Sequence, residues 1–154
     1  MGRAMTTTKE MFEKILNDLR ATGDVEASAI VSRDGLLMAS NISTNVQADT
    51  FAAMAAIMSS AAETAITELG KGKVDRVIAE SKEIKIITSG ASENVLLVLM
   101  AQPSAALGLI LVEMDKAVKK ISRVMSGEPL EGESEVPIGS TIDGIKNRLK
   151  DLEV

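Results

Sequence analysis

The sequence predicts an α+β three-layer sandwich, in which helices cover both faces of one antiparallel sheet. The predicted elements follow the order helix, two strands, helix, three strands, helix. The last strand, residues 94–101, is continuously apolar after Asn94, which indicates burial on both faces and a central place between helices. The turns between the last three strands are too short for crossovers, so these strands form an antiparallel meander. The earlier hairpin has to join the same sheet to be stable.

The first helix and the first hairpin are predicted by periodicity and by turn chemistry. Over residues 9–20 the apolar side chains recur at helical spacing, and Gly23 is placed to end the helix. Two short strands are expected at 27–32 and 36–40. The Asp34-Gly35 pair between them predicts a tight turn in which both central residues take positive φ.

The later elements follow from the same signals. A long helix is expected over 46–69, and strands are expected at 74–80, 84–89 and 94–101. Ser104, which follows a proline, is placed to cap a last helix that runs to about residue 125. One domain is therefore expected over 9–125, after a flexible N-terminus at 1–8.

The remaining residues have a different composition. Residues 126–139 carry glutamates among glycines and prolines, with no basic residue between them, which is typical of an acidic linker and lacks the spacing of a calcium-binding loop. Residues 140–154 are expected to form a short amphipathic helix with the stripe Ile142, Ile145, Leu149 and Leu152. We expect this stripe to dock on the rest of the assembly or on a partner.

The long helix at 46–69 carries the main functional prediction. At about 100° per residue, one apolar stripe is expected to face the sheet: Phe51, Met54, Ala55, Met58, Ala62, Ala65, Ile66 and Leu69. The opposite side has no charged residue between Thr50 and Ala62, whereas a solvated helix face is normally charged. The high helix propensity of alanine is the alternative explanation. Because this layout has no further element to cover that side, we expect a second subunit to cover it.

The strand at 74–80 is expected at an edge of the sheet, because it directly follows the long helix. An exposed edge with branched apolar residues promotes aggregation unless another strand pairs with it. Pairing of two copies about a two-fold axis would satisfy this edge and bring the two long helices side by side. The predicted dimer interface therefore draws on the helix and the strand: Ala52, Ala53, Ala56, Ser60, Val74, Arg76 and Ile78.

The composition argues against several classes of function. The 154 residues include no His and no Cys, which removes a Ser–His pair, a thiol nucleophile, a disulfide and the usual ligands of structural zinc. With no Trp, no Tyr, two Phe and a net charge of −5, the chain is poorly suited to nucleic acid. No apolar stretch approaches the roughly 20 residues of a membrane span, and no signal-peptide pattern is present. We expect a cytoplasmic protein with no enzymatic activity, no cofactor and no metal.

Some local motifs have a plain explanation beside a functional one. The Gly70-Lys71-Gly72-Lys73 segment lacks the spacing of a phosphate-binding loop and follows a helix, so a helix cap and turn is predicted. Arg33 and Arg76 lie near the expected interfaces. Either arginine is a candidate for insertion into a partner's GTPase site, although a solvated or seam-pairing arginine is the favoured interpretation. The first six residues match a loose myristoylation pattern of the kind that arises by chance.

The order and spacing of several segments resemble the Roadblock/LC7 family, which comprises dynein light chain Roadblock-like proteins and MglB-like regulators of small GTPases. The likeness runs from about residue 9 to residue 125. Its pieces are AIVSRDGL at 29–36, ELG at 68–70, VIAE at 77–80, VLLV at 95–98 and ALGL at 106–109. The resemblance implies a five-stranded antiparallel sheet with one long helix on one face and two helices on the other. It also implies a ten-stranded sheet in a homodimer.

The resemblance also implies a function. Family members are typically non-enzymatic adaptors, and several bind or regulate small Ras-like GTPases. A GTPase is expected over the paired long helices, at positions that this sequence fills with Ser59, Ser60, Glu63, Thr64 and Thr67. The prediction is a homodimeric regulator or scaffold for such a GTPase. The alternatives are a small-ligand sensor, which normally needs pocket aromatics that this chain lacks, and a purely structural dimerisation module of the profilin-like three-layer type.

Overall fold

The computed structural model describes residues 7–42 and 47–127. Helix α1 (Thr8–Arg20) comes first, followed by strands β1 (Val25–Ser32) and β2 (Leu37–Ile42) and by helix α2 (Ala48–Glu68). Strands β3 (Arg76–Glu80), β4 (Lys85–Ser92) and β5 (Val95–Ala101) lead to helix α3 (Leu107–Met125). The predicted order of elements is confirmed, with shifts of one to three residues at most ends. The expected acidic linker, apart from its first two residues, and the expected C-terminal helix lie outside the described residues.

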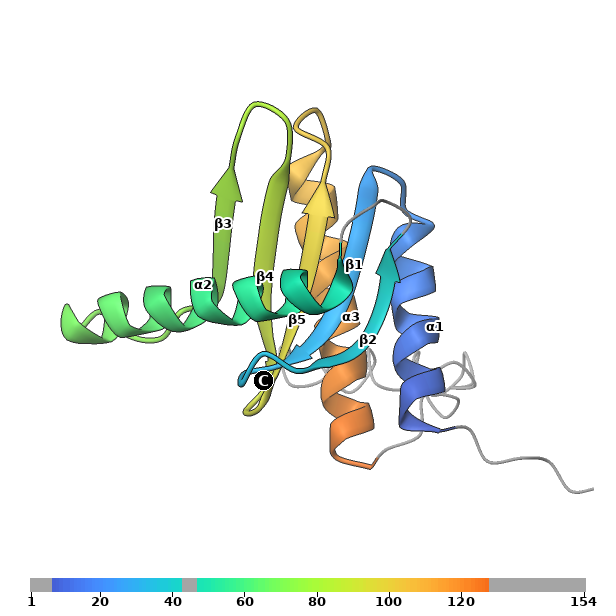
Figure 1. Cartoon of the computed structure of the whole chain (residues 1–154), viewed down its shortest axis with the longest axis horizontal. Helices are drawn as coiled ribbons and strands as arrows, with labels where there is room; N and C mark the ends of the chain where they lie inside the picture. Colours follow the sequence, from blue (N-terminus) through green and yellow to red (C-terminus); the bar gives the residue numbers. More distant parts are fainter. Residues whose placement is uncertain (1–6, 43–46, 128–154) are drawn as a thin grey trace, which may run out of the picture.

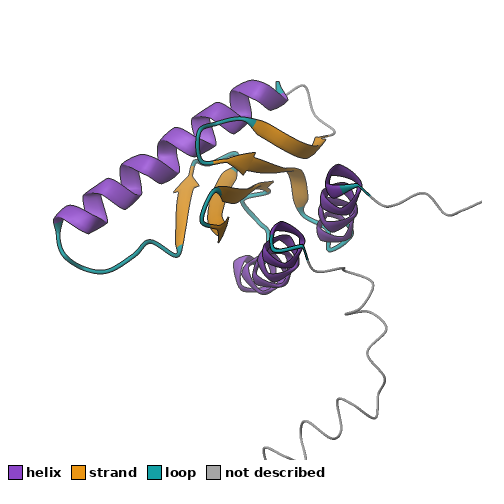
Figure 2. Ribbon diagram, turned by 90° about the horizontal axis from the view of Figure 1, so that it is seen from below, coloured by secondary structure: helices purple, strands orange, loops and turns teal. Residues whose placement is uncertain are grey.

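The five strands form one antiparallel sheet in the order β2-β1-β5-β4-β3. All seven residues of β5 are buried, as the apolar run predicts for a central strand. Helix α2 crosses one face of the sheet, and α1 and α3 cover the other (Figure 1; Figure 2). The α+β sandwich with a five-stranded sheet and three helices is therefore confirmed.

The two layers of the core differ in the size of their side chains. Between the sheet and the α1/α3 pair, large residues such as Phe12, Leu16, Met114 and Ile121 are almost fully buried. Between the sheet and α2, the buried cluster contains one aromatic residue, Phe51, among several alanines. Helix α2 can therefore lie close to the sheet, because small side chains leave little volume to fill.

The start of α1 is fixed by a reciprocal cap. The Thr7 hydroxyl accepts a hydrogen bond from the Glu10 backbone N–H at 3.1 Å, and the Glu10 carboxylate accepts one from the Thr7 backbone N–H at 3.1 Å. Hydrogen bonds from the Thr7 backbone and side chain lower the pKa of Glu10 from its usual value. Helix α1 therefore begins at a defined residue.

Two local expectations are wrong. In the β1–β2 hairpin only Gly35 has positive φ, at +93°, and the Gly35 N–H donates to the Ser32 carbonyl at 2.9 Å. This is a four-residue turn that ends in a left-handed glycine, in place of a two-residue turn with two positive φ angles. Helix α3 begins after Ala106, which provides no side-chain cap, and Ser104 lies in the preceding turn. The residues after Pro103 form a hydrogen-bonded turn between Ala105 and Gln102 that delays the helix.

Candidate functional site

Helix α2 is longer than the part of the sheet that supports it. Its first half lies over β1, β2 and β5, and its second half projects past the outer edge strand β3 (Figure 1; Figure 2). The buried residues of α2 all belong to its first twelve positions. From Thr64 to Leu69 every residue except Ile66 is exposed. Among the described residues, no strand and no other helix lies beneath the last turns of α2, and only the connection from α2 to β3 runs back there (Figure 2).

The supported half of α2 is rotated relative to the prediction. The buried face consists of Phe51, Ala52, Ala55, Ala56 and Ser59, whereas Met54 and Leu69 of the expected stripe are exposed. At about 100° per residue, the buried face is turned by about 70° from the predicted one. The large apolar residues Met54 and Ile57 consequently point away from the sheet.

The rotation is explained by the path of the β1–β2 hairpin. A Cβ atom on Gly35 would lie 3.5 Å from the Ala53 Cα and 3.8 Å from the Ala56 Cβ. The hairpin thus passes directly over the small residues of α2, and any larger side chain there would push it away. Ala52 and Ala56 face the chain's own sheet and hairpin and are buried in the single chain, whereas the sequence placed them on the outer side of the helix. Their place in a dimer interface stays a prediction.

A shallow groove separates the hairpin from α2. It is lined by Arg33, Asp34, Gly35, Ala53, Ala56, Ile57, Ser60 and Ala61. Three residues of the predicted dimer interface belong to this groove: Ala53, Ala56 and Ser60. Leu36 at the hairpin tip and Ile57 on the helix are both exposed apolar residues near it. No aromatic side chain lines the groove, which disfavours a small-ligand pocket.

The edge strand β3 pairs with β4 alone in the described part of the chain. Ile78, Ala79 and Glu80 are exposed, so the outer side of this strand is accessible. Its first residues, Arg76 and Val77, are half-buried, and just before them the Asp75 carbonyl accepts a hydrogen bond from the Ser89 hydroxyl at 3.4 Å. Val74 is half-buried and precedes the strand, which begins two residues later than predicted.

Arg76 links this edge strand to helix α3. Its Nη2 atom donates to both carboxylate oxygens of Asp115, at 2.8 and 3.0 Å. The register places Arg76 opposite Ser89 and Ile78 opposite Ile87, a core residue under α1 and α3. The Arg76 side chain therefore lies on the α3 side of the sheet, away from α2. This contact supports the interpretation of Arg76 as a structural arginine that forms an ion pair within the chain.

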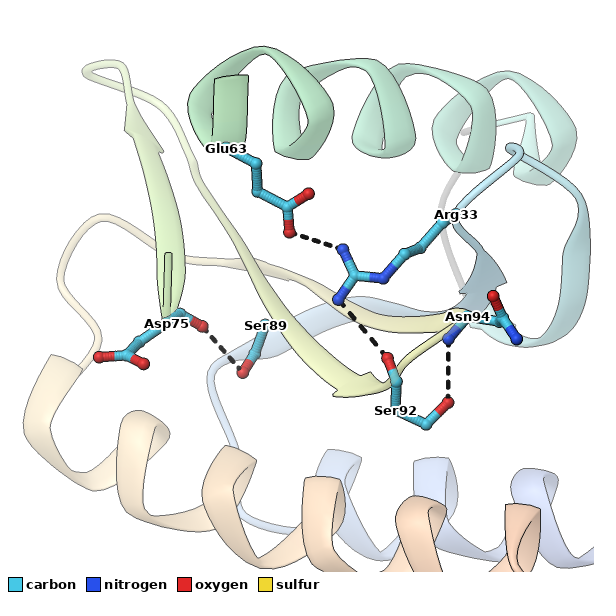
Figure 3. A network of polar contacts seen from close by, with 6 residues as sticks. All are labelled: Arg33, Glu63, Asp75, Ser89, Ser92 and Asn94. Carbon is cyan, nitrogen blue, oxygen red and sulfur yellow. Dashed lines mark hydrogen bonds and ion pairs between the residues drawn. The ribbon is translucent and has the colours of Figure 1, made fainter. Parts of the chain in front are cut away.

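Arg33 connects three segments that are distant in sequence (Figure 3). Its Nη1 atom donates to Glu63 Oε1 at 2.6 Å, and its Nη2 atom donates to the Ser92 carbonyl at 3.5 Å. The Arg33 backbone N–H donates to the Asn94 carbonyl at 2.9 Å. The turn between β4 and β5, the first hairpin and α2 are thus joined at one guanidinium group.

The structure separates the five residues expected to contact a GTPase. Ser59 is buried against the sheet, and Glu63 is half-buried and paired with Arg33. Ser60, Thr64 and Thr67 are exposed. Ser59 is therefore not available on the surface of this chain, and the accessible part of the predicted site lies in the second half of α2.

The main surface feature that the sequence prediction missed is the exposure of Met54, which lies near the exposed Ile57 on α2. Both residues were visible as large apolar side chains in an uncharged helix. Periodicity alone assigned Met54 to the inner stripe, because it assumes that the largest apolar residues face the core. That assumption does not hold for α2, because the close approach of Gly35 requires small residues on the inner side. This approach is a tertiary contact, which periodicity does not include.

Two kinds of site are absent from the described residues. Within 7–42 and 47–127, no group of three or more Asp or Glu side chains is arranged to hold a metal ion. No helix in the same ranges is long and apolar enough to cross a membrane.

Known proteins share this arrangement. A family model described as Roadblock/LC7 domain matches residues 11–101. The uncharacterized protein MJ1340 of Methanocaldococcus jannaschii is 33% identical over 111 residues, which are 72% of this chain and 96% of that protein.

Two solved structures have the same fold at low sequence identity. The Roadblock/LC7 domain from Streptomyces avermitilis is 22% identical with a TM-score of 0.70, over 74% of this chain and 97% of that one. Myxococcus xanthus MglB is 15% identical with a TM-score of 0.74, over 82% of this chain and 96% of that one. Together with the family model and the archaeal relative, the fold places this chain in the Roadblock/LC7 family.

Proposed function

We propose that this chain is a non-enzymatic, cytoplasmic, homodimeric regulator or adaptor that binds a small Ras-like GTPase over its paired α2 helices. The observation that carries the proposal is the projection of α2 beyond strand β3 (Figure 1). A helix with uncovered turns beside an open strand edge supports assembly with a second copy. Membership of the family that includes the MglB regulators supports a GTPase as the partner.

The dimer follows from two features of the same edge. Antiparallel pairing of β3 with its symmetry copy would satisfy the backbone N–H and C=O groups that alternate residues of β3 direct outward, and would give a ten-stranded sheet. The last turns of each α2 would then lie over the sheet of the other subunit. Leu69, which is exposed in the single chain, and Ile66, which is half-buried, would gain apolar contacts there. Burying one such side chain contributes about 1.5–3 kcal/mol when it was fully exposed before.

The GTPase surface would lie on the outward side of the paired helices. Met54, Ile57 and Ala61 share one side of α2, and Thr64 continues it toward the C-terminal end. Two copies side by side would double this apolar strip, with the Arg33–Glu63 pair at its border. An apolar centre with a polar rim is the usual composition of a protein interface.

The assembly is tested by sedimentation velocity on the full chain. Leu69→Glu is the test variant and Leu36→Glu its control, because the two leucines are 68% and 69% exposed and neither is needed for the core. We expect a dimer for the parent and for Leu36→Glu. The Leu69→Glu variant is expected to dissociate at least tenfold more readily, since a carboxylate would be desolvated at the interface. A monomeric parent at micromolar concentration would contradict the dimer.

The partner is tested by calorimetry against a panel of small Ras-like GTPases loaded with GDP or with a non-hydrolysable GTP analogue. We expect binding that depends on the nucleotide state and that weakens at least tenfold in Ile57→Glu. The GTP hydrolysis rate of the bound GTPase then separates a regulator from a scaffold. A dimer that binds none of them in either state would leave a structural dimerisation module as the better explanation.

A further inference from the structure

The outward side of α3 is divided into two chemically different parts. Near its N-terminal end, Leu109 and Val112 are 55% and 52% exposed. One turn later the same side becomes basic, with Lys116, Lys119 and Lys120. At about 100° per residue these five residues fall within a stripe of about 100°. The buried stripe of α3 lies on the other side of the helix: Ile110, Met114, Ala117, Ile121 and Val124.

The charges around the basic part come from two helices. Lys116 Nζ lies 3.4 Å from Glu113 Oε1 on the same helix, and its side chain is still 63% exposed. Asp18 of α1 lines a small cavity between α1 and α3 together with Glu113, Lys116 and Lys120. Lys119 is exposed on the outer side. The basic part is therefore a strip with Lys116 and Lys119 exposed, bordered on the side of α1 by Asp18 and Glu113. On the side of β3 it is bordered by Asp115, which is paired with Arg76.

The sequence after α3 carries the complementary pattern in reverse order. Helix α3 ends at Met125, and the first acidic residue beyond the described region is Glu128. Acids come first along the chain: Glu128, Glu131, Glu133 and Glu135. An apolar stripe with helical spacing follows: Ile142, Ile145, Leu149 and Leu152. A chain that turns back along α3 would meet the basic part first and the apolar part second.

We propose that residues 128–154 fold back antiparallel along the outward side of α3 of the same chain. The acidic segment would lie on Lys116, Lys119 and Lys120, and the stripe Ile142–Leu152 would cover Leu109 and Val112. This inference is independent of the proposed dimer and GTPase partner, because it concerns the opposite face of the sheet. Burial of apolar side chains on both partners drives the contact, and the charges set its direction.

The distances permit this path. From Gly127 back to Val112 the helix measures about 22 Å at about 1.5 Å per residue. Residues 128–139 span at most about 40 Å when extended, and about 20 Å on average as a flexible chain. The linker therefore reaches the apolar part without strain. A tether of this length holds the stripe at a millimolar effective concentration near α3.

The natural absence of cysteine makes the contact measurable by disulfide trapping in the full-length chain. Val112→Cys is combined with Ile145→Cys or with Leu149→Cys, and intramolecular disulfide formation is followed in a glutathione redox buffer. The matched control combines Val112→Cys with Asn147→Cys, which has the same tether but lies on the opposite side of the expected tail helix. We expect at least one of the two stripe cysteines to form the disulfide at least tenfold faster than the cysteine of the Asn147→Cys control.

A second measurement tests the electrostatic part. The double substitution Lys116→Glu with Lys119→Glu is expected to slow trapping at the stripe positions at least threefold. The control, Lys9→Glu with Lys14→Glu on α1, changes the net charge equally and is expected to leave the rate unchanged. Raising the salt from about 0.05 M to about 0.5 M should also slow trapping in the parent.

Two outcomes would overturn the proposal. Equal rates at the stripe and at Asn147→Cys would mean that the tail is tethered without docking. Disulfides formed only between chains would mean that the stripe occupies a second copy. Circular dichroism on each variant checks folding, which exposed positions such as Val112 should not disturb. A second site, Leu109→Cys, repeats the test if Val112→Cys lowers the helix content.

Discussion

Arg33 and Glu63 lie thirty residues apart in the sequence, yet Arg33 Nη1 and Glu63 Oε1 approach to 2.6 Å. The pair joins the β1–β2 hairpin to the part of α2 where support from the sheet ends (Figure 3). Because the same guanidinium reaches the Ser92 carbonyl, the position of α2 is tied to the β4–β5 turn as well. The direction in which the uncovered half of α2 leaves the sheet is set in part by this contact.

The Arg33–Glu63 pair is expected to contribute little to global stability. The two side chains are 32% and 38% exposed, so solvent screens their attraction. In a double-mutant cycle with Arg33→Ala and Glu63→Ala, we expect a coupling free energy below about 1 kcal/mol. Urea denaturation of the four proteins measures it. A coupling free energy several times larger would mean that the Arg33–Glu63 pair contributes substantially to holding α2 on the domain.

Gly90 is predicted to matter through Arg33. A Cβ atom at Gly90 would lie 2.9 Å from Arg33 Nη2, so Gly90→Ala has to displace the guanidinium. We expect a loss of about 1 kcal/mol, comparable to one ordinary hydrogen bond, because only the far end of a flexible side chain has to move. The same substitution in an Arg33→Ala background should be nearly neutral. Thermal denaturation of the single and double variants separates this contact from a general effect of glycine replacement.

Two glycines with different surroundings give opposite expectations. Gly35 has φ of +93°, and a Cβ there would meet the backbone of Ala53 at 3.5 Å. Gly35→Ala should cost at least about 1–2 kcal/mol because alanine disfavours this conformation. Gly108 lies in the first turn of α3 with open space around it, so Gly108→Ala should stabilise by up to about 1 kcal/mol. Chemical denaturation of both variants provides the comparison.

The orientation of α2 can be tested with one substitution on each side. Ala52 is fully buried on the sheet side of α2, so Ala52→Leu overfills the layer between helix and sheet and should destabilise the fold by about 1–3 kcal/mol. Ala61 is exposed, and Ala61→Leu should change the unfolding free energy by less than about 0.5 kcal/mol. Equal costs at the two sites in urea denaturation would contradict the observed rotation of the helix.

The cap of α1 predicts a dependence on pH. Because folding lowers the pKa of Glu10, its ionised form favours the folded state above the unfolded-state pKa. This contribution is lost as the pH falls through the lowered folded-state value. We expect Thr7→Ala to bring the pKa of Glu10 back toward its usual range in an NMR titration. The stability difference between parent and variant should then be larger at neutral pH than in acid.

Local signals were sufficient for the architecture. The uninterrupted apolar run at 95–101 identified the central strand, because such a strand needs burial on both faces. The short turns expected at 81–83 and 90–92 identified the meander, since no crossover fits into them. The second turn lies at 93–94 in the structure, because β4 continues to Ser92. Local signals also predicted the edge position of β3. They predicted a helix cap and turn at Gly70–Lys73, where Gly70 and Gly72 take positive φ.

The amino-acid sequence by itself thus determined the order of elements, the central and edge strands, the uncharged character of α2 and the resemblance to the family. Periodicity, turn residues and side-chain polarity act over a few residues and need no knowledge of distant contacts. Only the tertiary structure decided which side of α2 is buried, how far that helix projects beyond β3 and that Arg33 pairs with Glu63. Those features depend on where the hairpin crosses the helix, and they place together side chains that no local pattern relates.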